Sequence, residues 1–163
     1  PGPALLPVAA RRVSDPSRIV FVPGWNVPIH TTSLQNATLS KQTARIGDRA
    51  TRYLSLTTAG DDVFAPHHVS FICNLPAAGA YRVGVKAVLG PDQGILRAFR
   101  NDLPAGNEVN LYSAERALSG MLPLGEFEMR AGDNTLFLYL TGKDPRSTGV
   151  AFDLVEIVFD RGR

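Results

Sequence analysis

An aromatic ring and an amide that stand side by side in a turn are the most chemically suggestive residues. Trp25 and Asn26 follow Pro23 and Gly24, which predict a loop. An indole ring can stack on the apolar face of a pyranose, and a neighbouring amide can bond its hydroxyl groups. Trp25 can equally plug one end of a folded domain, because tryptophan is mostly buried. This pair is the first candidate binding site.

A second group of the same kind lies in the stretch 101–123, which has no clear hydrophobic period. Tyr112 supplies the ring, and Asn107 and Asn110 supply amides. Amides donate and accept hydrogen bonds, as recognition of sugar hydroxyls requires. We therefore expect a binding loop here that shares a ligand with the first pair.

Two other tyrosines fall within predicted strands and are expected to be packing residues. They are Tyr81 and Tyr139. Tyr139 shares its strand face with Thr135 and Thr141. That polar face also fits a ligand platform on an open sheet.

Paired acids raise the possibility of catalysis. Glu126 and Glu128 share one face of a predicted strand, with Cα atoms about 6.5–7 Å apart. Two carboxyl groups at such a separation can cleave glycosidic bonds. That chemistry needs a cleft and one acid with a raised pKa, whereas alternating glutamates are typical of a solvent-facing strand. We expect the solvent-facing arrangement.

Metal binding by the histidines is not expected. His67 and His68 are adjacent, with Asp61 and Asp62 nearby. Neighbouring residues of a strand point to opposite faces, so two adjacent histidines rarely bind one ion.

Other functional classes lack their signatures. Cys73 is the only cysteine, which excludes an internal disulfide and a cysteine metal cluster. Ser119-Gly120 lacks the flanking glycine of a nucleophile elbow, and no glycine-rich phosphate loop occurs. The 17 Lys and Arg residues are scattered among 15 Asp and Glu residues, so no basic stripe indicates nucleic-acid binding.

The composition indicates which elements must position these residues. The 163 residues include 15 Gly and 12 Pro, yet 44% are hydrophobic and only 20% are charged. So many helix breakers between apolar runs favour an all-β domain over a helical bundle or a disordered chain. No stretch reaches the roughly 18 consecutive apolar residues of a membrane span. Residues 1–18 are expected to be a leader or linker, and residues 19–163 a single domain; the missing initial Met suggests processing or an excised domain.

About eight short strands are predicted from period-two alternation between turn signals. The predicted strands are Ile19–Val22, Tyr53–Thr57, His68–Asn74, Ala80–Val88, Ile95–Arg100, Leu124–Arg130, Thr135–Thr141 and Val150–Asp160. Ser113–Leu118 fits one helical turn or a loop, and the polar stretch 31–62 is otherwise hard to interpret. Regular short strands with turns every ~8–12 residues predict an antiparallel β-sandwich of the jelly-roll type.

A buried acid is expected in the last predicted strand. Asp153 has the same parity as Val155, Ile157 and Phe159, so in a regular strand its carboxylate points into the core. A buried carboxylate needs partners, either a cation or loop N–H groups. We expect loop N–H groups, and Asp153 is only a weak metal candidate.

Residues 67–160 resemble the galactose-binding-like jelly-roll modules of secreted bacterial glycoside hydrolases. The resemblance lies in the order of short motifs: Gly79-x-Tyr81-x-Val83-x-Val85, Gly90-Pro91-Asp92-Gln93-Gly94, Asn110-Leu111-Tyr112, Leu124-Gly125, Ala131-Gly132-Asp133-Asn134-Thr135-Leu136, and Gly142-Lys143-Asp144 through Phe152-Asp153-Leu154. It implies a non-catalytic module that binds sugars or braces an enzyme domain.

The same resemblance raises the question of a structural calcium. Many members of this family open with a strand whose Glu helps to hold the ion, and Ile19–Trp25 contains no acid. The usual Gly-Leu-Asp ending reads Ala151-Phe152-Asp153. We therefore expect no cofactor.

The sequence favours a carbohydrate-binding-type module that is exported by a bacterium, to the periplasm or the exterior. Its partner would be a glycan, bound by Trp25, Asn26, Asn107, Asn110 and Tyr112, and a catalytic domain would be its neighbour. Two alternatives remain open: a structural or protein-interaction module without sugar binding, and a small glycan hydrolase or lyase. The oligomeric state is not predicted.

Overall fold

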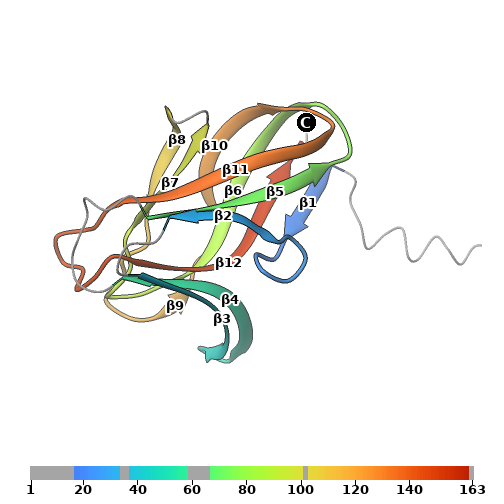
Figure 1. Ribbon diagram of the computed structural model, residues 1–163. Coiled ribbons are helices and arrows are strands. Elements are labelled where there is room, and N and C mark those ends of the chain that lie inside the picture. Colours follow the sequence, from blue (N-terminus) through green and yellow to red (C-terminus); the bar gives the residue numbers. More distant parts are fainter. Residues whose placement is uncertain (1–16, 34–36, 59–66, 101–102, 162–163) are drawn as a thin grey trace, which may run out of the picture.

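Twelve β-strands form two antiparallel sheets that pack face to face, within residues 17–33, 37–58, 67–100 and 103–161, which the computed structural model describes (Figure 1). The seven-stranded sheet contains β1 (Arg18–Phe21), β3 (Ala37–Ile46), β4 (Arg49–Thr58), β6 (Gly79–Leu89), β9 (Ala117–Leu118), β10 (Leu122–Met129) and β12 (Ala151–Asp160). The five-stranded sheet contains β2 (Ile29–Ser33), β5 (His68–Leu75), β7 (Ile95–Arg100), β8 (Leu103–Asn110) and β11 (Gly132–Gly142). The predicted all-β sandwich is confirmed.

The two sheets have different strand orders. The larger runs β10-β6-β12-β4-β3, with β1 added to β12 and β9 added to β6, and the smaller runs β2-β5-β11-β7-β8. None of the described residues forms a helix that could cross a membrane.

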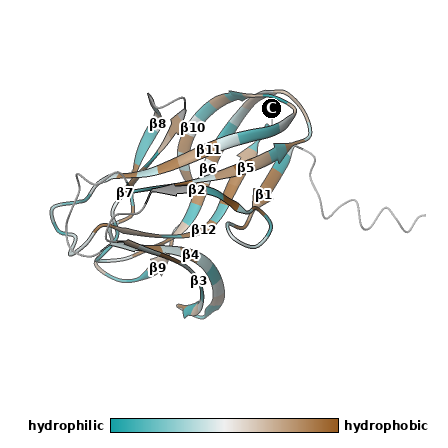
Figure 2. Ribbon diagram, viewed as in Figure 1, coloured by the Kyte–Doolittle hydropathy of each residue, from teal (hydrophilic) through white to brown (hydrophobic). Residues whose placement is uncertain are grey.

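Alternating side chains build the core between the sheets. Tyr81, Val83 and Val85 of β6 face Leu136 and Leu138 of β11, and all five are at most 3% exposed. Figure 2 shows the corresponding alternation of hydrophobic and hydrophilic residues along the strands. On β6 and β11 the inward faces expected from the sequence are those observed.

Several strands were missed in the sequence. β2, β3 and β8 were not predicted, and the stretch expected to be a helical turn or loop ends in the two-residue strand β9. β3 pairs with β4 along its whole length, but the distal part of this hairpin curves away from the rest of the sandwich (Figure 1). Its strands carry polar residues on both faces there, so the hydrophobic period disappears.

The central strand β12 changes partners halfway along. Its first half pairs with β4 up to Leu154, opposite Leu54. A register irregularity follows at Val155, and from Ile157 the strand pairs with β1 at Phe21. The part of β4 that precedes Leu54 therefore has no hydrogen-bonded neighbour on the β12 side. The seven-stranded sheet divides at this point, with β4 on one branch and β1 on the other.

Two glycines allow the sheets to meet closely at the other edge. Gly106 of β8 has φ 69°, and a Cβ there would lie 1.9 Å from the carbonyl oxygen of Leu124. On β10, in the facing sheet, a Cβ on Gly125 would lie 3.0 Å from the Cα of Gly106. No other residue type fits this contact between β8 and β10 without a shift of the backbone.

Candidate functional site

The five residues predicted to bind a ligand lie in three separate places. Trp25 and Asn26 occupy the loop between β1 and β2, where the Asn26 amide is bonded to the backbone of Val20 and Val22. The indole ring is half-buried, with Lys41 Nζ and the Arg52 guanidinium carbon each 5.3 Å from its centroid. Trp25 therefore contacts cations of the β3–β4 hairpin.

Asn110 and Tyr112 do meet in one cluster. Asn110 Nδ2 donates to Asp144 Oδ2 at 2.8 Å, and the Tyr112 N–H donates to Asn110 Oδ1 at 3.0 Å. Arg146 binds both carboxylate oxygens of Asp144 at 2.9 Å and lies 4.6 Å from the Tyr112 ring centroid. The hydrogen bonds from Arg146 hold the pKa of Asp144 well below its usual range, so this cluster is charged at neutral pH.

Asn107 belongs to neither group. It is exposed on β8, and its Nδ2 donates to the carbonyl of Pro123 on β10 at 3.3 Å. The segment 103–110, expected to be an irregular loop, is instead an edge strand. Whether these five residues bind sugar remains a prediction.

The outward face of the five-stranded sheet carries a cluster of stacked rings. His68 of β5 stacks on Tyr139 of β11, with centroids 4.7 Å apart and planes at 30°. Phe99 of β7 lies 4.2 Å from Tyr139 on the other side, and Phe137 lies 5.7 Å from His68. All four are half-buried although they face away from the core. We call His68, Phe99, Phe137 and Tyr139 the aromatic platform.

Polar groups border the aromatic platform. In the sheet register, Tyr139 is opposite His68 on one side and Arg97 on the other. Arg97 Nη2 donates to the Gly106 carbonyl, and Thr141 Oγ1 contacts Glu108 Oε2 at 3.3 Å. Two buried nitrogens, His68 Nδ1 and Arg97 Nε, have no hydrogen-bond partner within the described ranges.

His68 is suited to neutral hydrogen bonding. Burial lowers its pKa below the ordinary value of histidine, so the uncharged ring dominates at pH 7. A neutral imidazole has one donor and one acceptor nitrogen. It can therefore bond a hydroxyl group in either direction.

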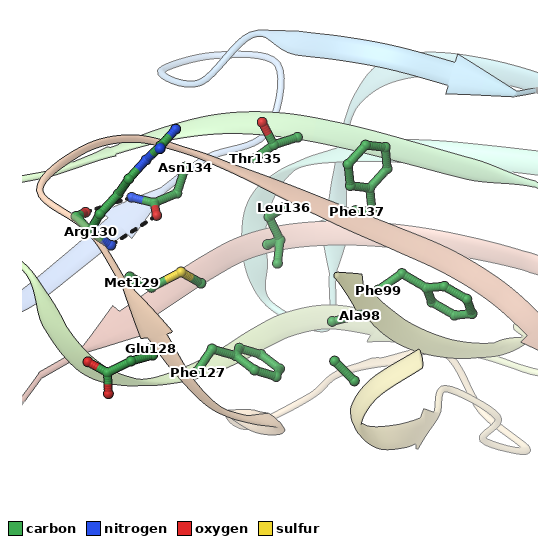
Figure 3. Close-up of a pocket in the computed structure, with 11 residues that line it drawn as sticks. Ala98, Phe99, Phe127, Glu128, Met129, Arg130, Asn134, Thr135, Leu136 and Phe137 are labelled. Atoms are coloured by element: carbon green, nitrogen blue, oxygen red, sulfur yellow. Dashed lines mark hydrogen bonds between the residues drawn. The ribbon is translucent and has the colours of Figure 1, made fainter. Parts of the chain in front are cut away.

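A hollow lies between the sheets at the β10–β11 hairpin (Figure 3). Its volume is about 500 Å³, and Ala98, Phe127, Met129 and Leu136 point into it. The amide of Asn134, at its rim, is bonded to the backbone of the turn, so it holds the hairpin together. Apolar side chains at the edge of the core line this hollow, so it suits an apolar group better than a sugar.

The predicted environment of Asp153 is wrong in two respects. The irregularity at Val155 reverses the parity of β12, so the carboxylate lies on the outward face of the seven-stranded sheet. It is 4% exposed, and its partners are Ser55 Oγ at 2.7 Å and Arg116 Nη2 at 3.0 Å, not loop N–H groups. Burial raises the pKa of Asp153, and both partners oppose that rise.

This environment does not fit calcium. Calcium takes six to eight oxygen ligands, and a guanidinium is a competing cation at the same carboxylate. Asp153 is thus held by Arg116, and no three acidic, histidine or cysteine side chains gather into a metal site in the described ranges. Asp61 and Asp62 lie outside those ranges.

The two glutamates of β10 occupy the solvent-facing positions that were expected. Glu126 lies opposite Arg82 and Glu128 opposite Ala80 on β6, and both glutamates are exposed. Neither side chain is buried, whereas acid catalysis of glycosidic cleavage needs a carboxyl group enclosed in a cleft.

Solved structures contain the same fold. A xanthan lyase from Paenibacillus aligns with 83% of this chain at TM-score 0.66 and 19% identity. A GH26-CBM35 β-(1,4)-mannanase from Podospora anserina aligns with 91% at TM-score 0.58 and 11% identity. A family 35 carbohydrate-binding module from Clostridium thermocellum aligns with 88% at TM-score 0.56 and 12% identity. No family model and no curated protein sequence matches the chain.

The extent of these alignments differs. The chain spans 12% of the lyase and 28% of the mannanase, but 97% of the family 35 module. At such identities the similarity establishes the fold. It confirms the predicted all-β sandwich, a fold that the family 35 carbohydrate-binding module also has.

Proposed function

We propose that the chain is a non-catalytic carbohydrate-binding module whose glycan lies across the aromatic platform. The observation that carries this proposal is the half-buried ring of Tyr139, which lies beside His68 and Phe99 on the outward face of the five-stranded sheet. Aromatic rings that gather on an outward face and not in the core indicate a binding surface.

The recognition mechanism follows from the geometry. The half-buried rings of Tyr139 and Phe99 offer apolar area to the carbon–hydrogen face of a sugar. His68 and Arg97 would then bond the hydroxyl groups at the edge of that sugar. An open face provides few contacts, so affinity is expected in the micromolar to millimolar range.

A larger protein context is part of the proposal. The lyase and mannanase chains are several times longer than the region aligned with this chain. We infer an accessory module of a secreted, glycan-active bacterial protein, with catalysis in a neighbouring domain. The exposed positions of Glu126 and Glu128 support a non-catalytic role here.

Calorimetric titration with neutral hexasaccharides of β-glucan, β-mannan and β-xylan tests the function. At least one is expected to bind, and Tyr139→Ala should weaken it about tenfold or more while Tyr139→Phe retains most of the affinity. Loss of binding in Tyr112→Ala with none in Tyr139→Ala would move the site to the Asp144 cluster. Failure of every hexasaccharide to bind would favour a structural or protein-interaction module.

A further inference from the structure

The guanidinium of Arg116 enters a group of oxygen atoms on the outward face of the seven-stranded sheet. Its Nη2 atom donates to Asp153 Oδ2 of β12 and to the Tyr53 hydroxyl of β4, each at 3.0 Å. Ser55 of β4 donates to the other oxygen of the same carboxylate at 2.7 Å. Two strands thus direct their oxygen atoms toward one cation, which comes from the segment that precedes β9.

A second carboxylate lies beside this cation. Asp92 is in the turn between β6 and β7, and a Cβ atom placed on Gly90 would lie 3.3 Å from Asp92 Oδ1 and 3.9 Å from Arg116 Nη1. Burial is the main cause that raises the pKa of Asp153, and the charge of Asp92 raises it further. The two carboxylates therefore repel each other, and a cation beside both stabilises them. We call Tyr53, Ser55, Asp92 and Asp153 the oxygen cluster.

The oxygen cluster fits a guanidinium closely. Apart from the pair of Arg116 with Asp153, no ion pair among the described residues involves Asp92 or Asp153. The guanidinium carbon also lies 5.6 Å from the centroid of the Tyr53 ring. A planar guanidinium can stack on such a ring while it donates to several oxygen atoms, and an ammonium or a metal ion lacks that combination.

Asp153 is also the residue at which the sequence raised the question of calcium. It belongs to the terminal motif of the modules that this chain resembles, whose structural calcium is often held with a Glu of the first strand. The first strand here, β1, has no acid. We propose that Arg116 replaces a structural metal ion in this chain: its guanidinium is the cation at Asp153, so the sandwich is stable without calcium. This inference goes beyond the proposed function, since it concerns how the fold is held together.

A variant without the guanidinium should open the oxygen cluster to metal ions. Removal of Arg116 leaves the almost fully buried carboxylate of Asp153, a second carboxylate and two hydroxyl groups without a cation. Carboxylate and other oxygen atoms are the ligands that calcium takes. In Arg116→Ala, where the long side chain no longer fills the space, the cluster should therefore accept calcium weakly.

Thermal unfolding of the full chain tests the role of Arg116. The unsubstituted protein should have the same midpoint in EDTA and in millimolar calcium chloride. Arg116→Ala should unfold several degrees lower in EDTA, because Asp153 is left buried without its partner. Millimolar calcium chloride should restore part of that loss, whereas sodium chloride at equal ionic strength should not. When Asp153→Asn is added to Arg116→Ala, the calcium effect should disappear, which locates the ion at the oxygen cluster.

Arg82→Ala is the matched control. Arg82 lies on β6 of the same sheet, 3.9 Å from Asp160 and largely exposed, so its removal should shift the midpoint little and give no calcium response. Three results would overturn the inference: a lower midpoint of the unsubstituted protein in EDTA, a loss in Arg116→Ala no larger than in Arg82→Ala, or a rescue by sodium equal to that by calcium.

Two of these comparisons hold even if Arg116→Ala does not fold. The EDTA comparison uses the unsubstituted protein. Arg116→Lys keeps the charge but loses the planar fork, so it should still unfold at a lower temperature than Arg82→Ala. Equal midpoints of these two variants would count against the guanidinium as the structural cation.

Discussion

The guanidinium of Arg116 lies 3.0 Å from the carboxylate of Asp153, and together they sit on the outward face of the seven-stranded sheet. The same guanidinium is 3.0 Å from the Tyr53 hydroxyl. Asp153 is almost wholly buried by this arrangement, whereas the Arg116 side chain is 40% exposed. Arg116 thereby connects the segment that precedes β9 to Tyr53 of β4 and Asp153 of β12.

Removal of this arginine should make stability depend on pH. In Arg116→Met the Asp153 carboxylate loses its cation, so its pKa, already raised by burial, rises further. A carboxyl group whose pKa is raised in the folded state stabilises the fold at acid pH. This stabilisation is lost as the pH rises through the raised pKa. The loss in unfolding free energy should be roughly 1–3 kcal/mol at pH 7 and smaller at pH 4. Urea denaturation at both pH values measures it.

Arg82→Met is the control for that measurement. The Arg82 side chain is 64% exposed and 3.9 Å from Asp160, so its removal should change stability by less than about 1 kcal/mol at either pH. An equal loss at pH 7 and pH 4 in Arg116→Met would contradict a charge-based role for Arg116.

The contact between β8 and β10 should not tolerate a methyl group. Gly106→Ala places a Cβ 1.9 Å from the Leu124 carbonyl oxygen and keeps a positive φ. We expect a loss of roughly 2–4 kcal/mol from overpacking and backbone strain. Gly120→Ala, with nothing within 4 Å, should change stability by less than about 1 kcal/mol. Thermal unfolding of the two variants distinguishes these outcomes.

The Asp144 cluster should survive moderate acid. Because its pKa is lowered, the stabilisation by Asp144 is complete above the ordinary pKa of an aspartate and is lost only as the pH falls through the lowered value. The Arg146 amide, which donates to the Asp144 carboxylate, should therefore remain slow to exchange with deuterium at pH 4. In Asp144→Asn it should exchange faster. Fast exchange in the unsubstituted protein at pH 4 would refute this.

Cys73 should be inert while the protein is folded. It is buried in the core, and burial raises the pKa of its thiol to about 12. The reactive thiolate is thus scarce at pH 8. A disulfide reagent such as dithionitrobenzoate should modify it only at the rate of unfolding, and rapid modification in the absence of denaturant would contradict the core placement.

The sequence was informative where strands are half-buried. The alternation of Tyr81, Val83 and Val85 predicted both the strand and its inward face, because a core on one side enforces a period of two. The same reasoning failed at Asp153, since one bulged residue reverses the parity and leaves no mark in the pattern.

The candidate sites were harder to predict for a similar reason. Leu136 to Leu140 are apolar without interruption, so Phe137 and Tyr139 resemble core residues until the register places them outside. The small pocket where the seven-stranded sheet divides combines residues from β4, β6 and β12, and only the change of partners along β12 brings them together. The sequence identified Trp25 and Tyr112 as candidate binding residues. It did not show that Arg52 and Arg146 lie against their rings.

The central positions of β11 and β12 constrain the order of assembly. These two are the last described strands along the chain, yet β11 separates β5 from β7, and β12 joins β1, β4 and β6. During synthesis the earlier strands therefore have unpaired edges. Neither sheet can complete its strand pairing until β11 or β12 has left the ribosome. Folding is then governed by contacts between distant residues, which is slow and leaves exposed strand edges at risk of association. A chain interrupted before Ala151 would lose the strand that joins three others.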